Sequence, residues 1–154
     1  MIKVKHFRQS EGFCGPASLK IVLHYYGKKV SEKQIAKMAG STVKKGTPPE
    51  SIVKAAESFG FKAVLRENAS LSDIRKYIKK GIPVIVNWFF EDDGHYSVAV
   101  GMDDKKIYLS DPFDARIRKI SLEMFKRVWF DFSGPFLKNK SDIRLRLMIV
   151  VTPK

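Results

Sequence analysis

Apolar residues recur with helical spacing immediately after Cys14. Apolar side chains from Ala17 to Tyr26 occupy more than one face of the expected helix, and Gly27 ends the pattern. Pro16 suits the first turn of a helix, where its missing N–H is not needed. The pattern therefore predicts a largely buried helix with Cys14 at its N-terminus.

Three further cap signals in the first half of the chain predict three more helices. Their residues are Ser31 with Gln34, Thr47 with Pro48 and Glu50, and Ser70 with Asp73. In each signal a Ser or Thr that can cap the helix is followed three residues later by Gln, Glu or Asp. The predicted helices cover about 32–39, from Pro48 to Gly60, and from about 71 to Gly81.

The second half of the chain is rich in β-branched and aromatic residues and in turn signals. The predicted strands of this half are Ile82–Phe90, His95–Met102, Ile107–Ser110, Arg116–Ile120 and Ile143–Thr152, with a short helix at Ser121–Arg127. One further short strand, Phe61–Leu65, is predicted among the helices of the first half. Helices followed by an antiparallel meander are typical of an α+β fold. We expect one domain over residues 1–154, with a helical part at about 1–80 and a sheet part at about 81–154.

The composition narrows the function classes. A single cysteine excludes an internal disulfide and a cysteine-rich zinc site, and three scattered histidines indicate no metal centre. Nothing in the sequence indicates a cofactor. The chain has neither a signal-peptide pattern nor an apolar run long enough to cross a bilayer, so we expect a cytoplasmic protein with no transmembrane segment.

The formal net charge of +13 favours an acidic partner, such as an acidic peptide or a nucleic acid. The basic residues are spread along the chain instead of forming a tail. This distribution is typical of solvated faces, and we expect no nucleic-acid partner. A basic peptide-binding or nucleic-acid-binding module stays open as an alternative function.

Cys14 is the first candidate for chemistry. The N-terminus of a helix favours the thiolate, which is the nucleophilic form of cysteine. The alternative is a cysteine buried in the core, where free cysteines are common.

Candidates for the remaining groups of a nucleophilic site follow from the predicted strands. His95 begins a strand directly after Gly94, and Asp111 closes the next strand, so a hairpin would bring the two together. Gln9 precedes Cys14 by five residues and could donate to an oxyanion. The alternatives are a polar residue at a strand start, an Asp-Pro turn and a surface glutamine.

The face of the strand that carries His95 predicts how the helix would pack. His95, Ser97, Ala99 and Gly101 alternate with larger residues, so they share one face. Small side chains permit close packing, and we expect the helix of Cys14 to lie on this face.

The ordered set of Gln9, Cys14-Gly15-Pro16-Ala17, Gly94-His95-Tyr96 and Asp111-Pro112 resembles the papain-like cysteine peptidases that remove double-glycine leaders from bacteriocins. The resemblance implies a papain-like fold with a helical half packed on an antiparallel sheet. It also implies a cysteine peptidase with Cys14 as nucleophile, His95 as general base and acid, Asp111 as its orienting group and Gln9 as oxyanion donor.

The same resemblance implies the partners. The substrate would be a peptide or protein, such as an acidic leader peptide cleaved after a Gly-Gly motif. A membrane transporter would be a separate chain. An acyl or peptidyl transferase on the same scaffold is a second enzymatic alternative, because the same Cys14 thioester could pass to an amine instead of water.

Overall fold

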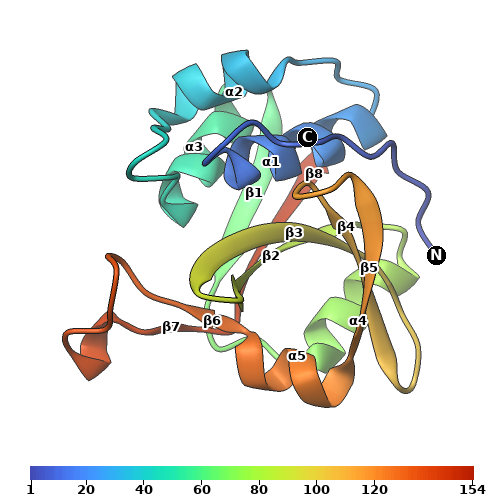
Figure 1. The fold of residues 1–154 in the computed structure, drawn as a ribbon. Helices are drawn as coiled ribbons and strands as arrows, with labels where there is room; N and C mark the ends of the chain where they lie inside the picture. Colours follow the sequence, from blue (N-terminus) through green and yellow to red (C-terminus); the bar gives the residue numbers. More distant parts are fainter.

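The computed structural model describes residues 1–154 and has two groups of helices on opposite faces of an antiparallel sheet (Figure 1). In chain order the elements are α1 (Cys14–Tyr25), α2 (Glu32–Ala39), α3 (Pro49–Ser58), β1 (Phe61–Arg66), α4 (Leu71–Lys79), β2 (Val84–Phe90), β3 (Asp93–Met102), β4 (Lys106–Asp111), β5 (Arg116–Ser121), α5 (Leu122–Val128), β6 (Phe130–Asp131), η1 (Lys140–Asp142), β7 (Arg144–Leu145) and β8 (Leu147–Pro153). No helix combines the length and the apolar character needed to cross a membrane.

The main sheet has six strands in the order β1-β8-β2-β3-β4-β5. Strands β2 to β5 form the predicted meander, and all neighbouring pairs are antiparallel. The last strand of the chain, β8, lies between β1 and β2. The two edge strands of the sheet are β1, from the first half of the chain, and β5, from the second half. The predicted α+β class, with helices packed on an antiparallel sheet, is confirmed.

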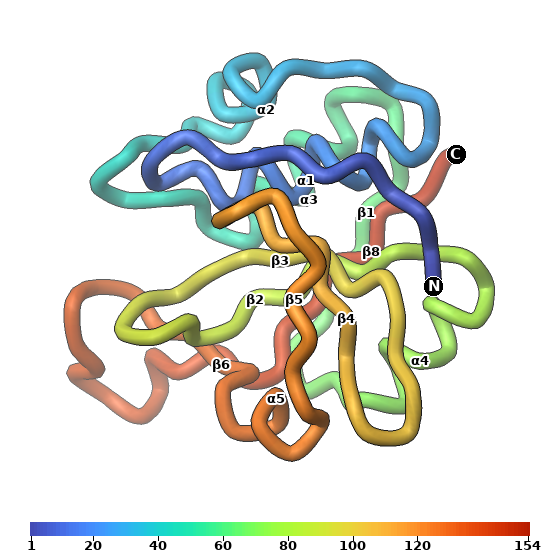
Figure 2. The backbone as a smooth tube through the Cα atoms, turned by 45° about the vertical axis from the view of Figure 1, so that its right-hand side comes forward, coloured from blue at the N-terminus to red at the C-terminus, as the bar shows by residue number.

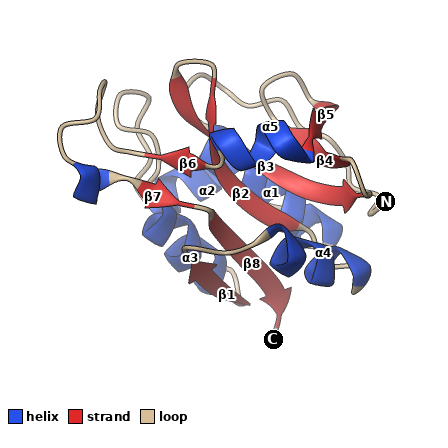
Figure 3. Cartoon of the chain, turned by 90° about the horizontal axis from the view of Figure 1, so that it is seen from below, coloured by secondary structure: helices blue, strands red, loops and turns tan.

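Two hydrophobic cores lie on the two faces of the sheet. Figure 3 looks onto the sheet, with α4 and α5 in front of the strands and α1, α2 and α3 behind them. On one face, α1 packs against Tyr96, Val98 and Val100 of β3. On the other, Ala99 lies in the core that α4 and α5 cover, together with the fully buried Phe125 of α5. The prediction that α1 packs on the small-residue face of β3 is therefore wrong, because α1 buries the larger side chains.

The cap signals place most helices correctly. Ser31 and Ser70 both form complete capping boxes at the starts of α2 and α4. At α3 the prediction is wrong by one residue, since Pro48 is the N-cap and makes no side-chain cap bond. The Thr47 hydroxyl instead bonds the Ser41 hydroxyl at 2.6 Å, because this threonine belongs to the loop that precedes the helix.

The predicted final strand, Ile143–Thr152, is two strands in the structure. Arg146 interrupts it with a φ of 47°, a left-handed conformation that few residues other than glycine adopt. Three hydrogen bonds hold this residue. Its backbone N–H donates to Trp129 O at 3.0 Å, its backbone O accepts from the Ala69 N–H at 3.1 Å, and its Nε donates to Ala69 O at 2.8 Å. The chain thereby leaves the β6–β7 ribbon and enters the main sheet as β8.

Ser18 of α1 provides a test of the buried helix. Its side chain is fully buried, and its hydroxyl has no hydrogen-bond partner. Because alanine is the better helix former and has no polar group to desolvate, Ser18→Ala should raise the free energy of unfolding by about 0.5–1 kcal/mol. Urea unfolding followed by circular dichroism measures this change.

A matched control is available in α3. The Ser58 hydroxyl donates to Ala55 O at 2.6 Å, so Ser58→Ala removes a formed bond and should not stabilise the protein. A loss of stability in Ser18→Ala would contradict the assignment of Ser18 as an unpartnered core hydroxyl.

Candidate active site

Cys14 is the first residue of α1 and is partly exposed, whereas the next residues of the helix are buried. Two glycines permit the backbone around it to pack closely. A Cβ at Gly15 would lie 3.1 Å from Thr47 Cβ, and a Cβ at Gly12 would lie 2.9 Å from Val43 Cα. Gly12 also has a φ of 76°, which suits glycine. The thiol is thus held at a helix N-terminus beside the loop that leads into α3.

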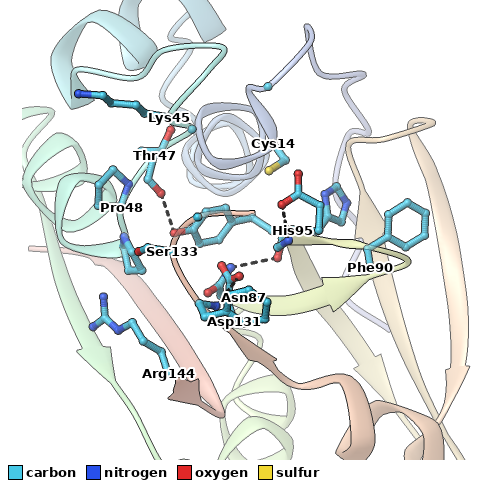
Figure 4. Close-up of a pocket in the computed structure, with 18 of the residues that line it drawn as sticks. Cys14, Lys45, Thr47, Pro48, Asn87, Phe90, His95, Asp131, Ser133 and Arg144 are labelled. Atoms are coloured by element: carbon cyan, nitrogen blue, oxygen red, sulfur yellow. Dashed lines mark hydrogen bonds between the residues drawn. The ribbon is translucent and has the colours of Figure 1, made fainter. Parts of the chain in front are cut away.

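Cys14 opens into a cleft of about 780 Å³. One wall is formed by the start of α1 and the loop before α3, and the other by the β2–β3 hairpin and the loop after β6 (Figure 4). Gln9, Cys14 and His95 all line this cleft. Figure 4 places Cys14 on the helical wall and His95 on the strand wall.

The His95 ring is buried among aromatic side chains. Its centroid lies 5.1 Å from that of Phe90, 5.7 Å from that of Trp88 and 6.4 Å from that of Phe113. Its Nε2 pairs with Asp111 Oδ1 at 2.6 Å. Because Nε2 bonds Asp111, Nδ1 is the ring nitrogen that can form a hydrogen bond with a second group.

Asp111 is fully buried at the end of β4 and holds three hydrogen bonds. Besides the His95 ring, the Phe113 N–H donates to Oδ1 at 3.1 Å and Arg118 Nε donates to Oδ2 at 2.7 Å. Burial alone would raise the pKa of Asp111. The hydrogen bond from His95, the positive charge of its ring, and the hydrogen bonds from Arg118 and the Phe113 N–H together outweigh burial and lower this pKa.

The charge state of His95 follows from its neighbours. Burial lowers the pKa of the imidazole, but hydrogen bonds with Asp111 and Cys14, and the charges of both, raise it to about 9. His95 is therefore mostly an imidazolium at neutral pH. Such a ring can hold a proton between a thiolate and a carboxylate.

Gln9 enters the cleft from the N-terminal segment. Its backbone N–H donates to Pro112 O at 2.7 Å, directly after Asp111. In Figure 2 this segment runs across α1 toward the turn between β4 and β5. The side-chain Nε2 donates to Ser10 O at 3.4 Å, and the buried Oε1 has no partner. The amide is thus only weakly engaged within the protein.

The four predicted site residues therefore come together, with Asp111 behind His95 and the other three in the cleft. The other two histidines do not line the cleft. His6 pairs with the Ser110 hydroxyl at 2.8 Å, and the His24 ring packs edge-on against Phe7. No group of three or more metal-ligating side chains is present.

Sequence reasoning missed Asp131, which lies at the floor of the cleft (Figure 4). A Cβ at Gly94 would collide with its carboxylate, so the glycine before His95 makes room for this side chain. Asn87 lies beside it and donates from Nδ2 to His95 O at 3.2 Å. Burial raises the pKa of Asp131, although hydrogen bonds from the Phe132 N–H and Asn87 oppose this.

Arg118 of β5 is the second residue that sequence reasoning missed. The prediction placed it in a strand without a role, although its Nε bonds the buried carboxylate of Asp111. Its spacing of seven residues from Asp111 gives no signal, because the contact depends on how β4 and β5 pair.

Comparisons with known proteins agree with this geometry. The model of the Peptidase_C39 like family matches residues 1–135. An uncharacterised protein of Methanothermobacter marburgensis is 35% identical over 127 residues, which cover 79% of this chain and 80% of that protein. A Lactococcus lactis protein named as a lactococcin transport/processing ATP-binding protein, LcnC-like, is 34% identical over 123 residues, which cover 78% of this chain but only 17% of that protein.

A solved structure gives the same picture. The chain matches a double glycine motif protease from an AMS/PCAT transporter, solved in complex with its leader peptide, with a TM-score of 0.75 and 27% identity over 99% of this chain and 94% of that one. A C39-like peptidase structure from Bacillus anthracis shares the fold with a TM-score of 0.74, at 18% identity over 99% of this chain and 98% of that one. The chain therefore belongs to the Peptidase_C39 like family and is a cysteine-type peptidase.

Proposed function

We propose that Cys14, His95 and Asp111 form the catalytic triad of this peptidase and that Gln9 completes its oxyanion hole. The observation that carries the proposal is the 2.6 Å pair between His95 Nε2 and the buried Asp111, beside a cleft that Cys14 shares with His95. The Asp111 carboxylate fixes the ring, so Nδ1 is directed to the thiol.

In the proposed reaction the Cys14 thiolate attacks a peptide carbonyl in the cleft. The side chain of Gln9 and the backbone N–H of Cys14 at the start of α1 stabilise the negative charge that develops on the carbonyl oxygen. His95 gives its proton to the leaving amine, and the thioester forms. His95 then takes a proton from water, which attacks the thioester and releases the acid.

We infer that the substrate is a peptide with a leader that ends in a double glycine. The support is the similarity to a double glycine motif protease in complex with a leader peptide and to a lactococcin-processing transporter. The net charge of the whole chain is +13, which suits an acidic leader bound over the wider surface. The cleft itself carries both signs, with Lys44, Lys45 and Arg144 beside Glu50, Glu91, Asp92, Asp93 and Asp131. A separate transporter is the partner that the relatives suggest, and residues 1–154 would act as one peptidase domain.

The specificity is tested with two peptides that differ only before the cleavage site. A leader peptide ending in Gly-Gly should be cut after the second glycine, whereas the same peptide with Val-Val should react at least about tenfold more slowly. Mass spectrometry of the products measures both. Equal cleavage of the two peptides would contradict the specificity, and transfer of the acyl group to an added amine in preference to water would contradict hydrolysis.

The triad is tested by substitution. Cys14→Ala and His95→Ala should each lower kcat on the Gly-Gly peptide by about 10⁴-fold or more, because each removes a group that acts as part of one unit. His24→Ala serves as the control, since this ring packs on Phe7 away from the cleft. Activity that survives in Cys14→Ala would exclude the thiol as nucleophile.

The pH dependence follows from the protonation of His95. The pKa of this ring is raised to about 9, so the imidazolium required by the thiolate persists through neutral pH and is lost as the pH rises through about 9. The value of kcat/KM should accordingly fall above about pH 9, by about tenfold per pH unit. A pH–rate profile on the same peptide measures this limb, and a fall already near pH 6.5 would contradict the Asp111–His95 pairing.

A further inference from the structure

The second oxygen of the Asp111 carboxylate has its own dedicated partner. Oδ1 receives the His95 ring and the Phe113 N–H, while Oδ2 accepts only from Arg118 Nε, at 2.7 Å. Asp111 is 0% exposed, so bulk solvent does not reach this oxygen. Without Arg118, one oxygen of a buried carboxylate would be left unpaired.

Arg118 also contacts the ring that packs on His95. Its Cζ lies 4.7 Å from the centroid of Phe90, within the range of a cation–π interaction. The Phe90 ring in turn lies 5.1 Å from the His95 ring. One guanidinium therefore contacts two of the neighbours of the imidazole, the Asp111 carboxylate and the Phe90 ring.

We propose that Arg118 is a positioning residue of the active site, which fixes the rotation of the Asp111 carboxylate and thereby the orientation of His95. The proposal rests on the proposed triad. A carboxylate held at Oδ2 by a planar, rigid donor cannot turn about its own axis, so Oδ1 stays directed at His95 Nε2. The strand pairing supports this arrangement, because β5 lies against β4 along its whole length.

The charged and titratable groups around this unit come from several elements. Cys14 of α1 and Asp111 of β4 act on His95 directly, and Arg118 of β5 acts through Asp111. Arg118 also lies 3.8 Å from Asp114, and His6 of the N-terminal segment pairs with Ser110, next to Asp111. On the other side of His95, the residues near Gly94 are Asp93 and Asp131.

These groups give two opposite expectations for the loss of Arg118. If Arg118 only contributed a positive charge, its removal would favour the imidazolium and raise the pKa of His95. If it holds Asp111 in place, its removal weakens the hydrogen bond that keeps this pKa near 9, and the pKa falls toward 6.5. The direction of the change therefore separates positioning from simple electrostatics.

The experiment compares Arg118→Gln, Arg118→Lys and Arg116→Gln with the wild type. Arg116 is the matched control, because it is an arginine of the same strand, is exposed and forms no ion pair. NMR titration of the His95 ring measures its pKa, and steady-state kinetics on the Gly-Gly peptide give kcat and KM separately. Thermal unfolding establishes that each variant is folded at the temperature used.

We expect Arg118→Gln to lower the pKa of His95 and to reduce kcat by about 10- to 100-fold with little change in KM, since the substrate is bound but the base is misplaced. Arg118→Lys keeps the charge and one donor and should give intermediate values, and Arg116→Gln should match the wild type. A pKa in Arg118→Gln that stays near 9 or rises overturns the proposal, as does an equal loss in Arg116→Gln.

The NMR readout does not depend on peptidase activity. If the wild type cuts no peptide, the proposed function fails, while a fall in the His95 pKa in Arg118→Gln still supports the positioning role. If the wild type is active and the pKa is unmoved, only the role of Arg118 fails.

Discussion

The structure depends on keeping one carboxylate ionised where water does not reach it. Asp111 is fully buried, and an uncompensated ion in such a place would cost several kcal/mol. Its donors come from β3, from β5 and from the turn after β4. These three bonds tie the strands together at one end of the sheet, and they leave the His95 ring a single orientation. The same contacts therefore stabilise the fold locally and prepare the site for chemistry.

The thiol is brought to this ring by a separate set of constraints. Helix α1 is buried along most of its length, so its axis is fixed by the core beneath it. Gly12 and Gly15 let its first turn approach the loop before α3, and the bond from Gln9 N–H to Pro112 O ties the preceding segment to the turn beside Asp111. The position of Cys14 is thus set by backbone packing, whereas the His95 ring is held by the side-chain hydrogen bond to Asp111.

Features with a local signal could be predicted from the sequence. The capping boxes at Ser31 and Ser70 fixed two helices, and the order of the motifs around Cys14, His95 and Asp111 identified residues that the structure brings together. Features that depend on distant pairing could not be predicted. The insertion of β8 between β1 and β2 has no local signal. The face of β3 that α1 buries was predicted wrongly, because side-chain size alone does not decide which face a helix covers.

The cleft itself is held by a chain of polar contacts that no short motif reveals. Arg144 pairs with Glu50 at 2.7 Å and Glu67 at 3.2 Å, which joins α3 and the end of β1 to the β6–β7 ribbon. On that ribbon Arg144 is the strand partner of Asp131, whose carboxylate fills the space against Gly94. These contacts lead from the helical layer to Gly94, the residue before His95. Arg144 is partly exposed, so each ion pair contributes little to the free energy of unfolding. The main effect of its two carboxylate partners is to hold the β6–β7 ribbon in position. Arg146, with its φ of 47°, follows β7 directly, so the ribbon that carries Asp131 ends where the chain enters the main sheet as β8.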